Sequence, residues 1–209
     1  MAIMIRPMCI ADEEAVSDIC FVTSPWGKEG KESLRRLVAL RWAYHYIHHE
    51  MPHCHVAVDT EANDTVVGYL LCAPDTRQQE RDFQHLTLPL MKEEIKRLQP
   101  LPGLDRLKLQ KEFFFTPTEM LGLVVRKIMM EYPAHIHIDI NPAYHRRGIG
   151  RSLFAAHETH LRSIGCPGYH LIVGSKNAQA VFFYAAMQMQ DRAHVGGPFN
   201  FGIVFTKKV

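Results

Sequence analysis

The stretch from residue 135 to 163 constrains the fold more than any other part of the chain. Its first seven residues alternate strictly between isoleucine and polar or ionisable side chains, which predicts a β-strand. Pro142 ends that strand, and a basic turn containing Gly148 and Gly150 follows. From about 147 to 163, apolar residues recur at helical spacing, so an amphipathic helix comes next. A strand joined through such a turn to a helix predicts a fold that layers helices on a sheet.

The elements around this stretch predict an α/β (α+β) fold. Periodicity predicts, in chain order, a strand at 3–5, helices at 12–20 and 31–50, strands at 53–59 and 65–73, a strand at 168–174, a helix at 177–187 and a strand at 203–206. The residues between the strands at 53–59 and 65–73 have turn chemistry, so a hairpin is expected there. The alternation of strands and helices in the last third makes 135–141 a central strand.

Residues 76–133 are the least regular segment and predict a helical insertion before the central strand. Helical stretches at about 86–98 and 118–130 are separated by prolines, and we find no repeat, low-complexity tract or flexible linker. We therefore expect a single domain over 1–209. Phe113, Phe114 and Phe115 are expected to anchor the insertion.

Composition excludes several classes of protein. The apolar fraction of 47% and the charged fraction of 22% exclude disordered and fibrous chains. Lys+Arg number 24 and Asp+Glu 22, so the net charge of +2 gives no reason to expect a nucleic-acid partner. No apolar run approaches the roughly 18 residues that span a bilayer, so no membrane partner is expected. Five scattered cysteines without a CxxC pair, and an N-terminus unlike a signal peptide, favour a soluble cytoplasmic protein, either monomer or homodimer.

The basic turn has the features of an anion-binding site. The first amides of the following helix have no intrahelical partner, and the helix dipole adds partial positive charge there. Arg146, Arg147 and Arg151 add full charges beside Gly148 and Gly150, so phosphate or pyrophosphate is a suitable ligand. The absence of Gly-Lys-Ser/Thr excludes a Walker loop, and the spacing fits the dinucleotide fingerprint poorly. The alternative is a plain strand-to-helix turn with a solvated basic rim.

The polar face of the central strand carries His135, His137 and Asp139. A central strand of an α/β sheet is normally apolar on both faces, so three ionisable groups there indicate a wet cleft or a paired network. Asp139 or His137 is the candidate for substrate binding or for the general base. A hydrogen-bonded structural cluster is one alternative. A zinc or iron site built from the same three side chains is another, although no fourth ligand is evident.

Two motifs about thirty residues apart resemble those of the GNAT (GCN5-related) N-acetyltransferase family. The family's Gln/Arg-x-x-Gly-x-Gly/Ala reads His145-Arg146-Arg147-Gly148-Ile149-Gly150 in this chain. The family's Asn-x-x-Ala-x-x-Phe-Tyr is matched by Asn177, Ala180, Phe183 and Tyr184. His145 departs from the usual Gln or Arg, and Met187-Gln188-Met189 replaces the usual Leu-Gly-Phe. Within the family, the chain is most similar to the acetyltransferase-like domain of O-GlcNAc hydrolases and its stand-alone microbial relatives.

The resemblance implies a mixed, mostly antiparallel sheet that is splayed between strands 4 and 5 and flanked by helices. It implies acetyl-CoA as the donor, with CoA as product, and no metal. The backbone of strand 4 would pair with the pantetheine, and the turn would hold the pyrophosphate. The residues implied at the cofactor are Ile138, Asp139, Ile140, Arg146, Arg147, Gly148, Ile149, Gly150, Arg151, Ser152, Asn177, Phe183 and Tyr184.

The resemblance also implies a reaction. Tyr184 would protonate the departing thiolate, Asp139 would serve as base, and His135 and His137 would bind the acceptor. We expect an N-acetyltransferase that acts on a primary amine, either a small molecule or a lysine side chain. The alternative is a catalytically weak or inactive acetyl-CoA-binding module with a sensing or interaction role.

Overall fold

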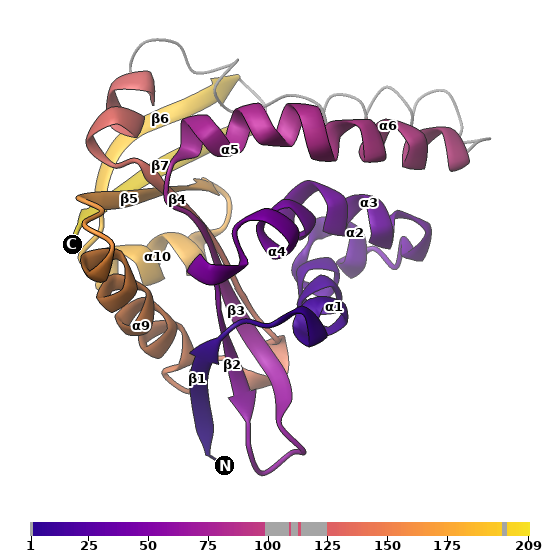
Figure 1. Ribbon diagram of the computed structural model, residues 1–209, viewed down its shortest axis with the longest axis horizontal. Helices are drawn as coiled ribbons and strands as arrows, with labels where there is room; N and C mark the ends of the chain where they lie inside the picture. The colour runs from indigo at the N-terminus through magenta and orange to yellow at the C-terminus, as the bar shows by residue number, and fades with distance from the viewer. Residues whose placement is uncertain (1, 99–108, 110–112, 114–124, 198–199) are drawn as a thin grey trace.

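Seven strands form one mixed sheet in the order β1-β2-β3-β4-β5-β7-β6 (Figure 1). The computed structural model describes residues 2–98, 109, 113, 125–197 and 200–209. All neighbouring strands are antiparallel except β4 and β5, which are parallel. The strands are β1 Ile3–Pro7, β2 His55–Asp59, β3 Thr65–Ala73, β4 Ala134–Ile140, β5 Gly168–Gly174, β6 Gln190–Gly197 and β7 Asn200–Lys208.

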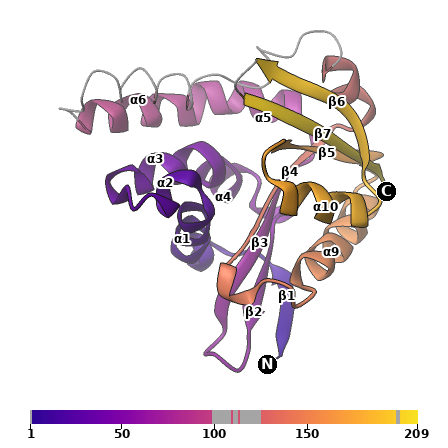
Figure 2. The same ribbon diagram turned by 180° about the vertical axis from the view of Figure 1, so that it is seen from behind.

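Helices cover both faces of this sheet (Figure 1 and Figure 2). The helices α1–α4 lie on one face, and α9 with α10 lie on the other. The helices are α1 Glu13–Thr23, α2 Pro25–Lys28, α3 Arg35–Ala39, α4 His45–His49, α5 Thr76–Asp82, α6 Leu88–Arg97, α9 Ile149–Ser163 and α10 Ala178–Ala186. Short π-helical segments at Leu40–Tyr44 and Phe83–Thr87 join α3 to α4 and α5 to α6.

The two faces of β3 explain why the chain has two cores. Successive side chains of a strand point to opposite faces. Tyr69 and Leu71 are fully buried against the α1–α4 layer, whereas Leu70 and Cys72 are fully buried on the α9 side. Because both faces are covered, β3 and β4 lie at the centre of the sheet. The alternation of strands and helices in the last third of the sequence predicts this position for β4.

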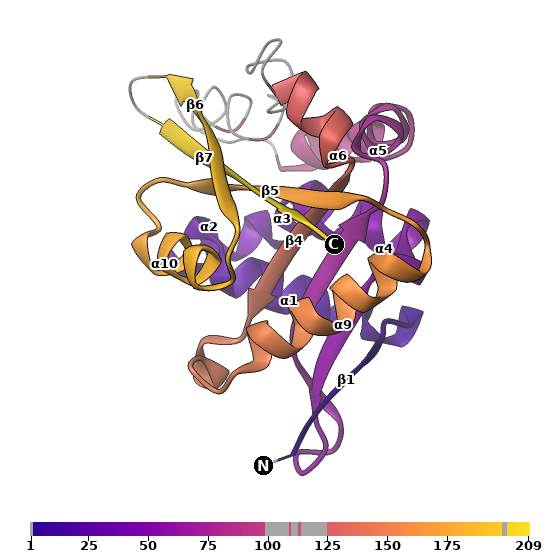
Figure 3. The same ribbon diagram turned by 90° about the vertical axis from the view of Figure 1, so that its left-hand side faces the viewer.

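The parallel strands β4 and β5 diverge soon after they pair (Figure 3). Their register contains only Ala134 opposite Tyr169 and His135 opposite His170. Beyond His135, β4 continues for five residues with β3 as its partner on one edge, and none of the strands that the structure describes pairs with its other edge. The splayed, mostly antiparallel sheet is therefore confirmed, and it leaves an open backbone edge beside the polar face of β4.

The insertion is helical where the structure describes it. The helices α5 and α6 follow one another, and a further helical segment occupies 125–131. Phe113 is buried and packs against Trp26 and Trp42, with ring centroids 4.7 Å and 5.3 Å away. Phe114, Phe115 and most of the helix expected at 118–130 lie outside the described residues. Within the described residues, no helix is long and apolar enough to cross a membrane.

Candidate functional site

A cavity of about 600 Å³ opens beside the free edge of β4. Its walls come from the end of β4, the turn before α9, the first turn of α9, the helix α10 and the corner between α1 and α2. The cavity-lining residues that the sequence singled out are Ile138, Asp139, Ile140, Arg146, Arg147, Gly148, Ile149, Gly150, Arg151, Asn177, Phe183 and Tyr184. The fold thus brings both motifs to one site, although they lie about thirty residues apart.

The turn between β4 and α9 adopts a left-handed backbone at two positions. Arg146 has φ 61° and Gly148 has φ 77°. The ring of His145 closes the turn, because its Nε2 donates a hydrogen bond to the carbonyl oxygen of Ile140 at 2.9 Å. His145, which departs from the family pattern, therefore ties the turn back to the end of β4.

Helix α9 presents its first amides at the mouth of this cavity. Gly148 is the N-cap, and the hydrogen bond from Ser152 N to Gly148 O opens the helical ladder. The amides of Ile149, Gly150 and Arg151 precede that bond and have no helical acceptor. Partial positive charge at this helix end adds to the nearby arginines, which suits a phosphate group.

Gly150 allows helices α9 and α10 to approach closely. A Cβ atom at this position would lie 2.8 Å from Cζ of Phe183, closer than real Cβ contacts come. Phe183 also packs edge-on against Phe154 of α9, with ring centroids 5.7 Å apart. The second glycine of the motif is therefore required by packing, whereas Gly148 is required by backbone conformation.

Tyr184 reaches the cavity from a buried position on α10. Its side chain is 8% exposed and is held by the rings of Phe154, Phe183 and Phe205. Burial raises the pKa of the Tyr184 phenol, and the negative charge of nearby Asp139 raises it further. The hydroxyl is therefore protonated at neutral pH and can donate a proton. Asn177 stands at the other end of α10, where its side chain caps the helix by accepting from Ala180 N.

The polar face of β4 forms a hydrogen-bonded network with β3. The Tyr69 hydroxyl donates to Oδ2 of Asp139 at 2.7 Å and lies 3.3 Å from Nδ1 of His137. Because that hydroxyl has a single proton, His137 must be the donor in the second bond, which leaves Nε2 with a free lone pair. Burial lowers the pKa of His137, although Asp139 opposes the effect, so its imidazole is neutral at neutral pH.

His135 lies apart from this network. Its Nδ1 is 2.6 Å from the Tyr46 hydroxyl, and it lines a second cavity of about 270 Å³ at the vertex where β4 and β5 separate. His137 also lines that second cavity, whereas Asp139 lines the larger one. The three residues that the sequence places on one strand face therefore form a polar strip on β4 that borders both cavities.

The side chains that could hold a metal ion differ from the three that the sequence suggested. Ligand atoms of Cys20, His137 and Asp139 lie within 4.8 Å of one another, whereas His135 is bonded to Tyr46. Burial raises the pKa of the Cys20 thiol to about 12, which opposes the thiolate form that a metal ion needs. Cys20 is thus best explained as a buried thiol of the α1 core.

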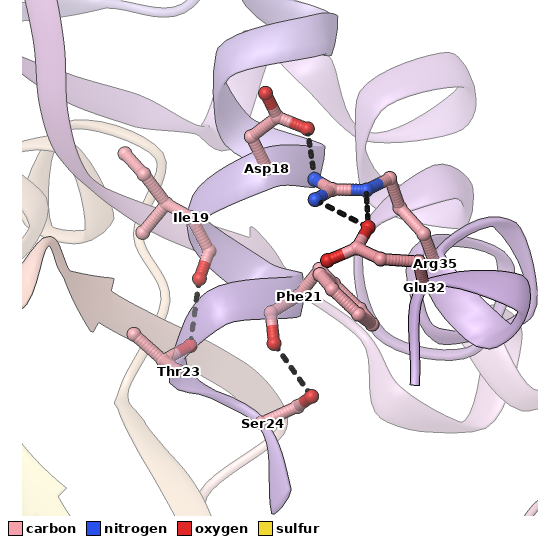
Figure 4. A network of polar contacts seen from close by, with 7 residues as sticks. All are labelled: Asp18, Ile19, Phe21, Thr23, Ser24, Glu32 and Arg35. Carbon is pink, nitrogen blue, oxygen red and sulfur yellow. Dashed lines mark hydrogen bonds and ion pairs between the residues drawn. The ribbon is translucent and has the colours of Figure 1, made fainter. Parts of the chain in front are cut away.

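The corner between α1 and α2 completes the mouth of the larger cavity and is held by a compact polar network (Figure 4). The Thr23 hydroxyl donates to the carbonyl of Ile19 at 2.8 Å, and the Ser24 hydroxyl donates to that of Phe21 at 2.6 Å. Nearby, Arg35 at the start of α3 pairs with Asp18 of α1 and with Glu32. These contacts fix the position of Thr23 beside the cavity.

The sequence did not predict the site residues that come from elements distant along the chain. Tyr69 comes from β3, and Thr23 and Lys28 come from the α1–α2 corner. Alternation along β3 could have placed Tyr69 on the face of Asp139, but only once the register between β3 and β4 was known. Ser152, expected at the cofactor, hydrogen-bonds to Gly148 one turn inside α9.

Comparisons with known proteins agree with this geometry. Residues 103–188 match the sequence profile of the acetyltransferase (GNAT) family. The acetyltransferase plu1384 of Photorhabdus laumondii is 32% identical over 82 residues, which cover 37% of this chain and 57% of that protein. The chain thus spans little more than half the length of that curated relative.

Solved structures extend the likeness to the whole chain. The structure of SsHAT has a TM-score of 0.72 at 24% identity and covers 100% of this chain and 98% of its own. The PaiA N-acetyltransferase of Thermoplasma acidophilum, in complex with coenzyme A, has a TM-score of 0.59 at 14% identity and full coverage of both chains. YncA of Salmonella typhimurium, a putative acetyltransferase with its cofactor acetyl-CoA, has a TM-score of 0.51 at 15% identity, covering 100% of this chain and 94% of its own. The fold that the two motifs imply is confirmed.

Proposed function

We propose that the chain is a GNAT acetyltransferase and that it transfers the acetyl group of acetyl-CoA to a primary amine. The observation that carries this proposal is the joint placement of three features on one cavity. These are the open edge of β4, the free amides of α9 and the buried phenol of Tyr184. An extended thioester cofactor needs all three.

In this proposal the pantetheine arm lies along β4. Among the described strands, only β3 pairs with the backbone of Ile138 to Ile140, so the other edge can hydrogen-bond to an amide-containing chain. The pyrophosphate would lie on the turn from Arg146 to Ser152, where amides and guanidinium groups surround the cavity. Asn177 and Phe183 would line the opposite wall from α10. Acetyl-CoA is accordingly the proposed donor, as in the named CoA and acetyl-CoA complexes.

The network on β4 supplies a base for the incoming amine. The amine arrives as an ammonium ion and must lose a proton before its nitrogen attacks the thioester carbon. Nε2 of His137 has a free lone pair, and its separation from Oδ2 of Asp139 is 3.8 Å. In the proposal His137 takes the proton and the Asp139 carboxylate stabilises the resulting imidazolium.

Tyr184 supplies the acid for the departing sulfur. Once the carbon–nitrogen bond has formed, the carbon–sulfur bond breaks and the departing sulfur takes the proton of Tyr184, while the second proton of the positively charged nitrogen restores the phenol. Amides on the open edge of β4 can stabilise the oxyanion that forms between these steps. The Tyr184 phenol lines the cavity and, like any phenol of ordinary or raised pKa, keeps its proton at neutral pH until a stronger base such as the thiolate forms beside it.

The test combines cofactor binding with turnover. Acetyl-CoA should raise the melting temperature of the wild type and of Tyr184→Phe alike, because the phenol oxygen is not needed for binding. Tyr184→Phe should reduce turnover with an amine by about 10² to 10⁴-fold. Tyr132→Phe, which changes a buried tyrosine outside the cavity, is the matched control.

Three outcomes distinguish an active transferase from a cofactor-binding module and test the role of Tyr184. Unchanged turnover in Tyr184→Phe would remove Tyr184 from the acid role. No stabilisation by millimolar acetyl-CoA would overturn the proposal altogether. Stabilisation by acetyl-CoA without transfer to any amine would favour the binding module with a sensing or interaction role.

A further inference from the structure

The second cavity, at the vertex between β4 and β5, is lined by Arg41, a cation whose Nε has no hydrogen-bond acceptor among the described residues. Its volume is about 270 Å³, and its walls come from the Leu40–Tyr44 segment, α5, β4 and β5. Arg41 lines it, and Nε of its guanidinium is buried without a hydrogen-bond partner. Among the residues that the structure describes, none forms a hydrogen bond or an ion pair with the Arg41 side chain.

The surroundings of Arg41 make this charge costly. Its guanidinium carbon lies 5.3 Å from the ring centroid of Phe83 and 5.7 Å from that of Trp42. Burial lowers the pKa of Arg41, and Glu80 on the same wall opposes this only in part. The Arg41 side chain is half-buried, so cation–π contacts and the remaining hydration offset part of the cost, but a buried Nε without an acceptor among the described residues remains destabilising. A fold retains such a group most readily where a ligand supplies the missing anion.

The histidines of the cavity do not supply that anion and add no positive charge. Burial lowers the pKa values of His135, His137 and His170, so all three are neutral at neutral pH. His170 Nδ1 donates to the carbonyl of Tyr132 at 2.7 Å, which leaves its Nε2 as an acceptor that is buried without a partner. The cavity thus combines an unpartnered donor with an unpartnered acceptor, so its natural occupant is polar.

The polar strip on β4 connects this cavity to the proposed reaction centre. His137 lines the vertex cavity, and two residues further along the strand Asp139 lines the larger one. At about 3.3 Å per residue, the strand from His135 to Asp139 spans roughly 13 Å. Because Arg41 and His137 line the same cavity, a short molecule can place one end beside Arg41 and the other beside His137.

We propose that the vertex cavity binds the acceptor and that the acceptor is a small amine with a carboxylate at its far end, which Arg41 recognises. The planar guanidinium matches a carboxylate with two parallel hydrogen bonds. The amine at the other end of the molecule then lies at His137, which lines the same cavity, for deprotonation. This inference rests on the proposed transferase function and names the substrate class of that same site.

The test uses ω-amino acids as probes, from 4-aminobutyrate to 8-aminooctanoate, each compared with its own carboxamide. The amide keeps the shape and removes the charge. With wild type, kcat/KM for the best acid should exceed that of its amide by about ten- to hundredfold. Arg41→Met should remove that preference and leave turnover of the amide within about twofold. Arg77→Met, at an exposed arginine of α5, should change neither.

Arg41→Lys is a control that distinguishes loss of carboxylate recognition from a structural effect of the substitution. It keeps the charge but loses the planar fork, so it should retain part of the preference for acids. Equal turnover of acids and amides by wild type would overturn the inference, as would identical behaviour of Arg41→Met and Arg77→Met. If Arg41→Met does not fold, unchanged preference in Arg41→Lys relative to wild type would also count against it.

Calorimetry with CoA present separates this inference from the transferase proposal. Binding of an ω-amino acid to wild type but not to Arg41→Met, without turnover of any amine, would support the carboxylate site and refute the transferase. Turnover of amines without any preference for acids would support the transferase and refute the carboxylate site. No binding of any acid in the series would overturn the carboxylate site.

Discussion

The hydroxyl of Tyr69 donates a 2.7 Å hydrogen bond to the carboxylate of Asp139. The two residues lie directly opposite each other in the register of β3 and β4. Tyr69 is fully buried, so the sheet itself fixes the carboxylate at the edge of the larger cavity. The same hydroxyl sets the tautomer of His137, which makes one tyrosine the organiser of the proposed base.

Tyr69→Phe should therefore reduce turnover without preventing cofactor binding. Loss of the hydroxyl removes one donor to Asp139 and the acceptor for Nδ1 of His137. We expect kcat to fall by about tenfold and the free energy of unfolding to fall by about 1–3 kcal/mol. Steady-state kinetics and urea unfolding measure the two effects.

The control for this variant is Tyr169→Phe. Tyr169 is also fully buried and donates to Glu158 at 2.9 Å, but it lies outside both cavities. It should lose stability and keep kcat. An equal loss of kcat in both variants would show that Tyr69 acts through stability alone.

Gly150→Ala should weaken acetyl-CoA binding because of one contact. The added Cβ would meet Phe183 at 2.8 Å, so α10 must move away from α9. We expect a loss of about 1–2 kcal/mol in the free energy of unfolding and a higher Kd for acetyl-CoA. Gly174→Ala is the control, since a Cβ there would meet nothing within 4 Å.

A second substitution sharpens that prediction. With Phe183→Leu as background, the clash at 150 is relieved and alanine regains its advantage over glycine in a helix, up to about 1 kcal/mol. Gly150→Ala should then stop being destabilising. If the double variant were as unstable as the sum of the two single changes, the contact with Phe183 would not be the cause.

Stability should decrease on mild acidification because of a buried histidine cluster. His157 is fully buried with neither ring nitrogen bonded, and burial lowers its pKa to about 3, with His53, His55 and His160 adding to the effect. The unfolded chain has the ordinary value of 6.5 and therefore binds more protons between these pH values. The free energy of unfolding is therefore highest above about pH 6.5 and decreases as the pH falls. Protonation of His157 in the unfolded chain lowers it by about 2 kcal/mol at pH 5.

Urea unfolding at pH 7.5 and pH 5 tests the cluster. His157→Leu should reduce the difference between the two pH values, because the leucine cannot take up a proton. His85→Leu changes an exposed histidine and should leave the difference as in wild type. An equally steep pH dependence in His157→Leu would place the acid sensitivity elsewhere in the chain.

The sequence predicts the parts of the site that are local in the chain. The strand, turn and helix around Gly148, and the motif that ends at Tyr184, each depend on neighbouring residues. Tyr69 and Arg41 could not be predicted in the same way, because their roles depend on strand register and on helix packing across the sheet. The family resemblance therefore supplied the proposed cofactor side of the site, whereas the proposed acceptor side required the structure.

Strand β6 was missed for a physical reason. It is the edge strand of the sheet, paired with β7 alone, and its sequence from Gln190 to Gly197 lacks apolar alternation. Edge strands with charged residues resist pairing with other chains, and the same charges hide them from pattern analysis. The neighbouring β7 was predicted only at its apolar centre, 203–206, and extends from Asn200 to Lys208.

Gln188 occupies the position where the family pattern has glycine, and the backbone there keeps the conformation that glycine favours. Its φ is 60°, in the left-handed region, just after α10 ends. A side chain in that conformation costs about 1–2 kcal/mol, while glycine loses about 0.4–1 kcal/mol more entropy on folding. Gln188→Gly should thus raise the free energy of unfolding by about 0.5–1 kcal/mol, measured by urea unfolding. Gln84→Gly, at an exposed helical position, should lower it by a similar amount, and a destabilised Gln188→Gly would mean that the glutamine side chain makes a compensating contact.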